Sequence, residues 1–225
     1  IISILSYSQV LKNVQPVLIA LNSVFICALF YFDNSSNYIF TRAEMKRRLD
    51  LLDNSFDSKL SGRKSQEYFT NDHLSPGLYK LAVNCFENSH HSQFIISKML
   101  PGLIAKTAAI VLLFVASAYT GSGEIVRLFF ELSLPVYLAQ KLFRAWCYSV
   151  RMSSIYDRFK SLFNDLLKHD FSDKTAETMR LILDYETALA WAATPLSSSI
   201  FFKNKDRLAD EWNDLKQEYK INTAN

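Results

Sequence analysis

Three long and mostly apolar runs with few charges constrain this chain more than any other feature of its sequence. The first, 13–32, has 20 residues without a charge, and the second, 102–119, has 18 residues interrupted only by Lys106. The third, 125–143, leaves 16 of its 19 residues uncharged. Its charged members are Arg127, Glu131 and Lys141. A 20-residue helix is about 30 Å long, which matches the hydrocarbon core of a bilayer. The runs therefore predict membrane-spanning helices.

Long apolar runs also occur as buried helices of soluble all-α proteins, and this is the alternative reading. Three such runs separated by charge-dense segments favour the membrane, because a fold of 225 residues has little core in which to bury them. No convincing alternation of apolar and polar residues predicts a β-domain. The net charge of +3 is too small for a dedicated nucleic-acid-binding surface.

Charge distribution predicts the orientation of the spans. The turn at 120–124 contains glycine and no Lys or Arg, so 102–143 reads as an antiparallel hairpin. Nine Lys or Arg residues lie in 33–100 and twelve follow Phe143. The positive-inside rule therefore places both long segments in the cytoplasm.

These observations predict an all-α integral membrane protein with two transmembrane hairpins. Residues 1–32 form the first hairpin, with a partial first span that looks truncated in this chain and a second span at 13–32. A helical cytoplasmic insertion follows at 33–100, then the second hairpin at 102–143, and a cytoplasmic helical region at 144–225.

The cytoplasmic segments show helical periodicity. Thr41 and Glu44 have capping-box spacing, which predicts that an amphipathic helix begins at Thr41. Its predicted apolar face consists of Met45, Leu49, Leu52, Phe56 and Leu60. After the last span, a second face consists of Val150, Ile155, Phe159, Leu162, Phe163 and Leu166. A helix at 173–191 is followed by an interruption at Pro195 and three serines, and Leu208, Trp212, Leu215 and Tyr219 mark a final helix.

No motif of a conventional enzyme is present, so no catalytic residue and no cofactor is predicted. The sequence lacks a GxSxG elbow, an HExxH motif and a Walker lysine. Three widely separated cysteines do not form a zinc motif. Adjacent His90 and His91 could bind a metal or a proton, but without a carboxylate cluster they read as part of a solvated helix surface.

Charges inside the third run are candidate pore residues. Arg127 and Glu131 are four residues apart and share a helix face, and intramembrane charges commonly face a bundle interior or water. An ion pair within the helix, with Arg127 reaching outward, is the alternative. The same face continues toward the cytoplasm with further polar residues. The predicted pore-lining set is Arg127, Glu131, Gln140, Lys141 and Arg144.

The order of elements and two segments carry a family resemblance. Residues 49–57, with the Phe56-Asp57 pair, and the tail from Asp184 to Tyr219 resemble the four-transmembrane effectors associated with bacterial antiphage nucleotidyltransferases. The channel effectors of Hailong-type antiphage systems also look similar to this chain. The family's tryptophan-containing segment after Phe-Asp is replaced here by 59–62.

The resemblance implies an oligomeric channel of the bacterial inner membrane that a nucleotide signal opens or closes during phage infection. A channel of this size needs several copies, and a tetramer is expected. Basic residues flanking the membrane exits are the predicted ligand contacts: Lys46, Arg47, Arg48, Arg144, Arg151 and Arg158. Charges that only set the topology are the alternative. The competing function is a membrane-disrupting protein or a non-conducting scaffold that recruits partners through 41–60 and 204–219.

Overall fold

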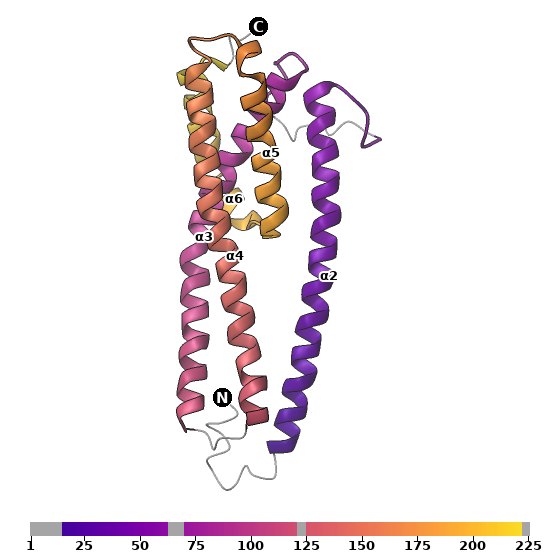
Figure 1. The fold of residues 1–225 in the computed structure, drawn as a ribbon, viewed down its shortest axis with the longest axis vertical. Helices are drawn as coiled ribbons and strands as arrows, with labels where there is room; N and C mark the ends of the chain where they lie inside the picture. Colours follow the sequence, from indigo (N-terminus) through magenta and orange to yellow (C-terminus); the bar gives the residue numbers. More distant parts are fainter. Residues whose placement is uncertain (1–14, 63–69, 121–124, 222–225) are drawn as a thin grey trace. The chain divides into compact units, whose positions relative to one another are not determined.

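A computed structural model describes residues 15–62, 70–120 and 125–221, and all of its secondary structure is helical (Figure 1). The long helices are α2 (Gln15–Phe56), α3 (Leu78–Thr120) and α4 (Ile125–Asp165). Shorter elements follow: the 3₁₀ helix η2 (Phe171–Lys174), α5 (Thr175–Ala192), α6 (Ser198–Lys203) and α7 (Lys205–Glu218). The prediction of an all-α chain is confirmed for these residues. The predicted partial span at 1–11 and the turn residues 121–124 lie outside them.

The long helices continue through a predicted helix start and through two prolines. Helix α2 has 42 residues, so Thr41 lies inside it and the predicted helix start there is wrong. Residues 33–40 contain neither Gly nor Pro, and their modest helix propensity costs less than ending and restarting a helix. Helix α3 likewise continues through Pro101, and α4 through Pro135.

One described helix is long and apolar enough to cross a membrane. This is the Leu78–Ala116 part of α3, whose most apolar stretch has a mean hydropathy of 2.1 and is only 6% buried within the chain. The predicted spans at 13–32 and 125–143 are not confirmed, and many of their side chains, including those of 125–132, lie outside the described part. The two hairpins therefore stay a prediction.

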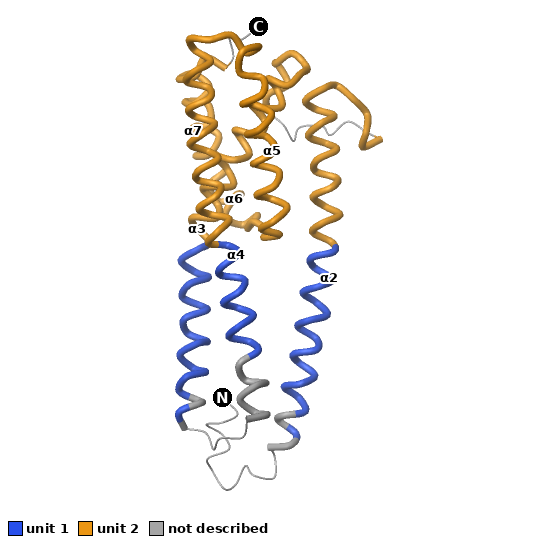
Figure 2. Tube along the Cα trace, in the orientation of Figure 1, with its two compact units in different colours: residues 1–38, 100–145 blue, residues 39–99, 146–225 orange. Residues whose placement is uncertain are grey.

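The chain divides into two compact units (Figure 2). Unit 1 comprises 1–38 and 100–145, and unit 2 comprises 39–99 and 146–225. Among described side chains of unit 1, large apolar groups such as Leu21, Phe25 and Leu112 are exposed. This apolar surface is what a lipid-facing or protein-covered surface requires.

Unit 2 has a buried aromatic core. The Phe86 ring stacks on Phe163 at a centroid distance of 5.1 Å and on Phe159 at 5.7 Å, and Trp212 meets its edge at 5.3 Å. All four side chains are almost fully buried. They come from α3, α4 and α7, so one cluster of rings joins the three helices.

The predicted apolar faces have different outcomes. Ile155, Phe159, Leu162 and Phe163 of α4 are buried, as are Leu208, Trp212 and Tyr219 of the final helix, whereas Val150 is exposed. On α2 the predicted face is wrong. Met45, Phe56 and Leu60 are exposed, while Leu51, Asp53 and Ser55 are buried.

The buried side of α2 is polar because it contributes to a hydrogen-bond network with α3. Buried Asn84 donates to Asn54 Oδ1 at 3.0 Å and to Ser55 Oγ at 3.1 Å. The side-chain oxygen of Asn84 accepts from the side-chain amide of Asn71, which also donates to Glu87 at 2.7 Å. These hydrogen bonds offset much of the desolvation cost of burying the polar groups, although the side-chain oxygen of Asn71 has no partner among the described residues.

Candidate functional site

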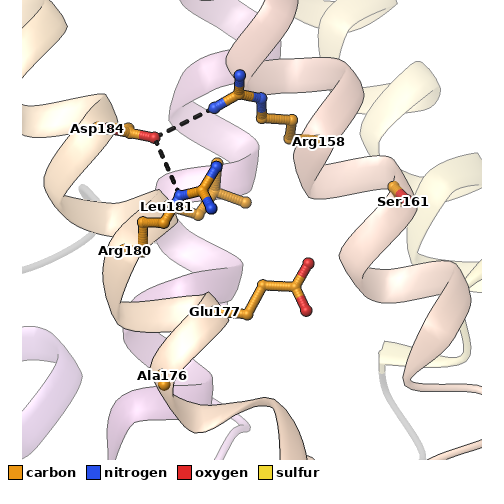
Figure 3. Close-up of a pocket in the computed structure, with 7 residues that line it drawn as sticks. All are labelled: Arg158, Ser161, Ala176, Glu177, Arg180, Leu181 and Asp184. Atoms are coloured by element: carbon orange, nitrogen blue, oxygen red, sulfur yellow. Dashed lines mark hydrogen bonds and ion pairs between the residues drawn. The ribbon is translucent and has the colours of Figure 1, made fainter.

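A groove between α4 and α5 is a candidate site in unit 2 (Figure 3). Its volume is about 570 Å³, which is within the usual range for small-molecule sites. We call it the α4–α5 groove. It is lined by Arg158 and Ser161 of α4 and by Ala176, Glu177, Arg180, Leu181 and Asp184 of α5.

Two guanidinium groups in the groove share one carboxylate. Arg158 Nη1 lies 3.2 Å from Asp184 Oδ2, and Arg180 Nε lies 3.9 Å from the same oxygen (Figure 3). Glu177 binds Lys174 at 3.0 Å. Each guanidinium has five N–H groups, so both arginines keep donors beyond those that face Asp184.

These ion pairs are weak because they are open to water. The side chain of Arg158 is 52% exposed and that of Arg180 is 72% exposed. An exposed pair of this kind contributes roughly 0–1 kcal/mol. An incoming phosphate or carboxylate can therefore replace Asp184 as the arginines' partner at little cost. Glu177 remains available as an acceptor for a donor group on the same ligand.

A second group of charges joins α2 to α5 and is more buried. Arg47 Nη2 donates to both carboxylate oxygens of Glu186, at 2.8 and 2.9 Å, and Arg48 Nε donates to Glu186 at 2.7 Å. Arg47 Nε also donates to Glu44 at 2.8 Å. We call Glu44, Arg47, Arg48 and Glu186 the Glu186 cluster. The side chains of Arg47 and Glu186 are only 17% and 20% exposed.

The predicted ligand residues thus fall into different environments. Arg47 and Arg48 lie together but donate to Glu186, whereas Arg158 lines the groove. Lys46 and Arg151 are exposed and line neither feature. Arg144 belongs to unit 1 and is partly exposed. The structure does not gather the six residues into one site within unit 2.

The predicted pore residues are described only in part. The side chains of Arg127 and Glu131 lie outside the described residues, although both positions belong to α4. Gln140 is exposed. Lys141 Nζ lies 2.9 Å from Asp33 Oδ1, which also accepts from the Tyr137 hydroxyl at 2.7 Å. Lys141, a predicted pore residue, therefore forms an ion pair with a carboxylate of α2.

Sequence reasoning missed the acidic and aromatic partners of these cations. Asp33 and Tyr137 are one example, and Asp184 and Glu186 are another. Arg180 was also missed. A weak signal was present: α5 carries the charged residues Glu177, Arg180, Asp184 and Glu186 among its apolar ones. That pattern shows charge on α5 but not which distant residues it meets.

The prediction of a solvated surface at His90 and His91 is wrong. His90 is buried, with its ring 5.4 Å from Tyr156 and its Nε2 3.4 Å from Glu211. The His91 ring is 5.7 Å from Phe201. Burial lowers the pKa of His91 to about 4, with the neighbouring His90 acting in the same direction. The aromatic residues of α4 and α6 cover this side of α3, which a pattern along α3 alone cannot reveal.

Metal binding finds no support in the part of the chain that is described. No three His, Cys, Asp or Glu side chains in 15–62, 70–120 and 125–221 form a group that could hold an ion. The Glu186 cluster and the α4–α5 groove are two charged features of unit 2 from which a function can be argued. No protein-family model matches the chain, and neither a curated protein nor a solved structure matches it.

Proposed function

We propose that this chain is an oligomeric membrane pore whose conductance is controlled by an anionic ligand bound to unit 2. One observation carries the membrane part. The apolar stretch of α3 is long enough to span a bilayer, yet only 6% of it is buried within the chain. A soluble all-α protein would bury such a stretch against its own helices. An exposed stretch instead needs lipid or other subunits around it.

A polar contact between α2 and α4 supports the pore. Asp33, Tyr137 and Lys141 form a hydrogen-bonded and ionic group in unit 1, whose other described side chains are largely apolar and exposed. Charged groups at membrane depth mark water-filled paths in many membrane proteins. The Lys141 side chain is still 52% exposed despite its contact with Asp33. It can therefore face water in an assembled ring.

The groove supports ligand control. Exposed Arg158 and Arg180 can bind a phosphate group bidentately. Asp184 of the groove and Glu186 of the Glu186 cluster are two residues apart on α5, and Glu186 binds two arginines of α2. Helix α2 extends from Gln15 and contains most of the predicted 13–32 span. Displacing Asp184 from its arginines would thus act on a helix that is bonded directly to α2.

The scaffold alternative loses one of its two recruiting helices. The apolar side of α7 is buried, since Leu208 and Trp212 belong to the core of unit 2. That helix has no apolar face left for a partner. Only the exposed Met45, Phe56 and Leu60 of the 41–60 segment remain for this role.

Reconstitution tests the proposal. The full chain in phospholipid vesicles should float with the lipid and resist carbonate extraction, and in planar bilayers it should conduct. Lys141→Gln should alter the ratio of anion to cation permeability, because it removes a charge from the polar path. Complete absence of conductance from vesicle-inserted protein, with and without ligand, would favour the scaffold.

Ligand binding is measured separately. A labelled oligodeoxynucleotide and ATP serve as phosphate-bearing probes, and Arg158→Gln with Arg180→Gln should weaken their binding and flatten its salt dependence. Arg151→Gln is the matched control, because Arg151 is an exposed arginine of α4 that does not line the groove. Equal binding by the double variant and the control would place the ligand elsewhere.

A further inference from the structure

Helix α6 and its flanks, residues 191–205, combine exposed aromatic rings with basic side chains. Trp191 is exposed and Phe202 is 70% exposed. Lys203 and Lys205 follow directly and are exposed as well. Single exposed aromatic residues are common in soluble proteins. Two in one short segment beside lysines are typical of a bilayer interface.

The segment is held in a fixed position rather than hanging free. The Ser197 hydroxyl caps α6 by accepting from the Ile200 amide at 3.3 Å. Ile200 and Phe201 pack against a core formed by Phe94, Ile95 and Leu208. The inner side of α6 is therefore partly buried, whereas Phe202 is exposed.

Its attachment point is the position on α3 where the apolar stretch begins. Met99 packs against the same core, and the Ser197 amide donates to Met99 Sδ at 3.3 Å. Gly102 begins the 18-residue apolar run, three residues further along the same helix. Three residues of α-helix cover about 4.5 Å. If that run crosses the bilayer, the point at which α6 attaches to α3 lies within a few residues of the lipid headgroups.

We infer that residues 191–205 form an interfacial anchor that binds the surface of an anionic phospholipid bilayer. Trp191 and Phe202 insert among the headgroups, and Lys203 and Lys205 contact lipid phosphates. Asp206 follows in the first turn of α7, so the local excess of positive charge is modest. Exposed Lys98, one residue before Met99, adds to it. The inference rests on the proposed membrane insertion of α3.

The anchor also restrains α5 and α7, which flank it. Trp191 is the penultimate residue of α5, and Lys205 is the first residue of α7. Lipid contact at both ends of the segment would fix the membrane-proximal ends of these helices. The C-terminal end of the helix that carries Asp184 and Glu186 would then be tied to the bilayer.

Depth-dependent fluorescence quenching tests the anchor in the full chain. A background with Trp146→Phe and Trp191→Phe retains Trp212, which is fully buried and serves as the internal reference. Phe202→Trp is the probe. Leu183→Trp is the matched control, because Leu183 is a 59% exposed apolar residue of α5, eight residues before Trp191. The proteins are reconstituted in vesicles of phosphatidylcholine and phosphatidylglycerol whose acyl chains are brominated near the headgroup.

The anchor predicts roughly a twofold loss of the emission added by Phe202→Trp, because its ring lies at headgroup depth, and little loss for Leu183→Trp. Native Trp191, retained in a Trp146→Phe variant, should be quenched in the same way, which guards against a folding defect in the probe variant. Unquenched emission from both reporters in chains that float with the vesicles would overturn the anchor while leaving membrane insertion intact. Chains that fail to float would overturn the membrane proposal and the anchor together.

Discussion

Replacing Glu186 with glutamine should destabilise unit 2 without changing its shape. Glu186 accepts three hydrogen bonds from Arg47 and Arg48, with donor–acceptor distances of 2.7 to 2.9 Å. Glutamine keeps the size of the side chain but has no charge and only one acceptor oxygen. Arg47 would then depend on Glu44 alone for charge compensation.

The expected loss in the free energy of unfolding is about 2 kcal/mol. Breaking a buried ion pair by removing one partner costs roughly 3–5 kcal/mol, and a hydrogen bond to a charged group contributes roughly 1.5–3 kcal/mol. The value lies in the lower range because Arg47 retains Glu44 and because the Arg48 side chain is 40% exposed. Water can therefore solvate part of the freed charge.

Trp212 provides the assay, because it lies at the edge of Phe86 in the core and its emission changes when unit 2 unfolds. Urea unfolding of the full chain in mild detergent gives the difference between variant and native protein. Glu177→Gln is the control, since Glu177 is a 54% exposed carboxylate of the same helix that pairs only with Lys174 among described residues. If Glu186→Gln and Glu177→Gln unfold at the same urea concentration, the Glu186 cluster does not hold α2 against α5.

Three further predictions concern the interior of unit 2. Phe86→Ala should lower the free energy of unfolding by about 3–5 kcal/mol, measured with urea, because it removes the ring on which Phe163, Phe159 and Trp212 pack. Asn84→Ala should cost about 1–3 kcal/mol in the same assay, because it removes the donor to Asn54 Oδ1 and to buried Ser55 Oγ. Unfolding free energy should fall as the pH drops from 6.5 to about 4, because His91 in the unfolded chain takes up a proton in this range while His91 in the folded chain does not. His91→Gln should reduce this slope in a pH series of thermal melts.

The helices themselves were largely predictable from the sequence, but their ends were not. Periodicity correctly placed the buried faces of α4 and α7, because those faces are lined by large apolar side chains. It placed a helix start at Thr41, where α2 in fact continues. A capping box is a local signal, and the same residues are also compatible with a helix interior. Glu44 pairs with Arg47 there, three residues along the same helix.

The candidate site was predictable only as a set of cations. Arg47, Arg48 and Arg158 stood out as basic residues near the predicted membrane exits, and all three form ion pairs with α5. Their partners lie 139, 138 and 26 residues away in the sequence. The pattern of charges along the sequence does not show which distant residues pair with one another. It cannot distinguish an arginine that a carboxylate holds in the interior from one that is open to a ligand.

Exposure is the property that separates the two kinds of arginine, and it depends on tertiary packing. Arg47 is 17% exposed and donates hydrogen bonds to both carboxylate oxygens of Glu186, whereas Arg158 is 52% exposed and shares Asp184 with Arg180. Displacing Glu186 would break three short hydrogen bonds in a partly buried site, which costs about 2 kcal/mol or more. Displacing Asp184 exposes a carboxylate that water already reaches, which costs roughly 1 kcal/mol or less. An anionic ligand therefore gains more from the α4–α5 groove than from the basic run at 46–48, although the run has the higher density of positive charge.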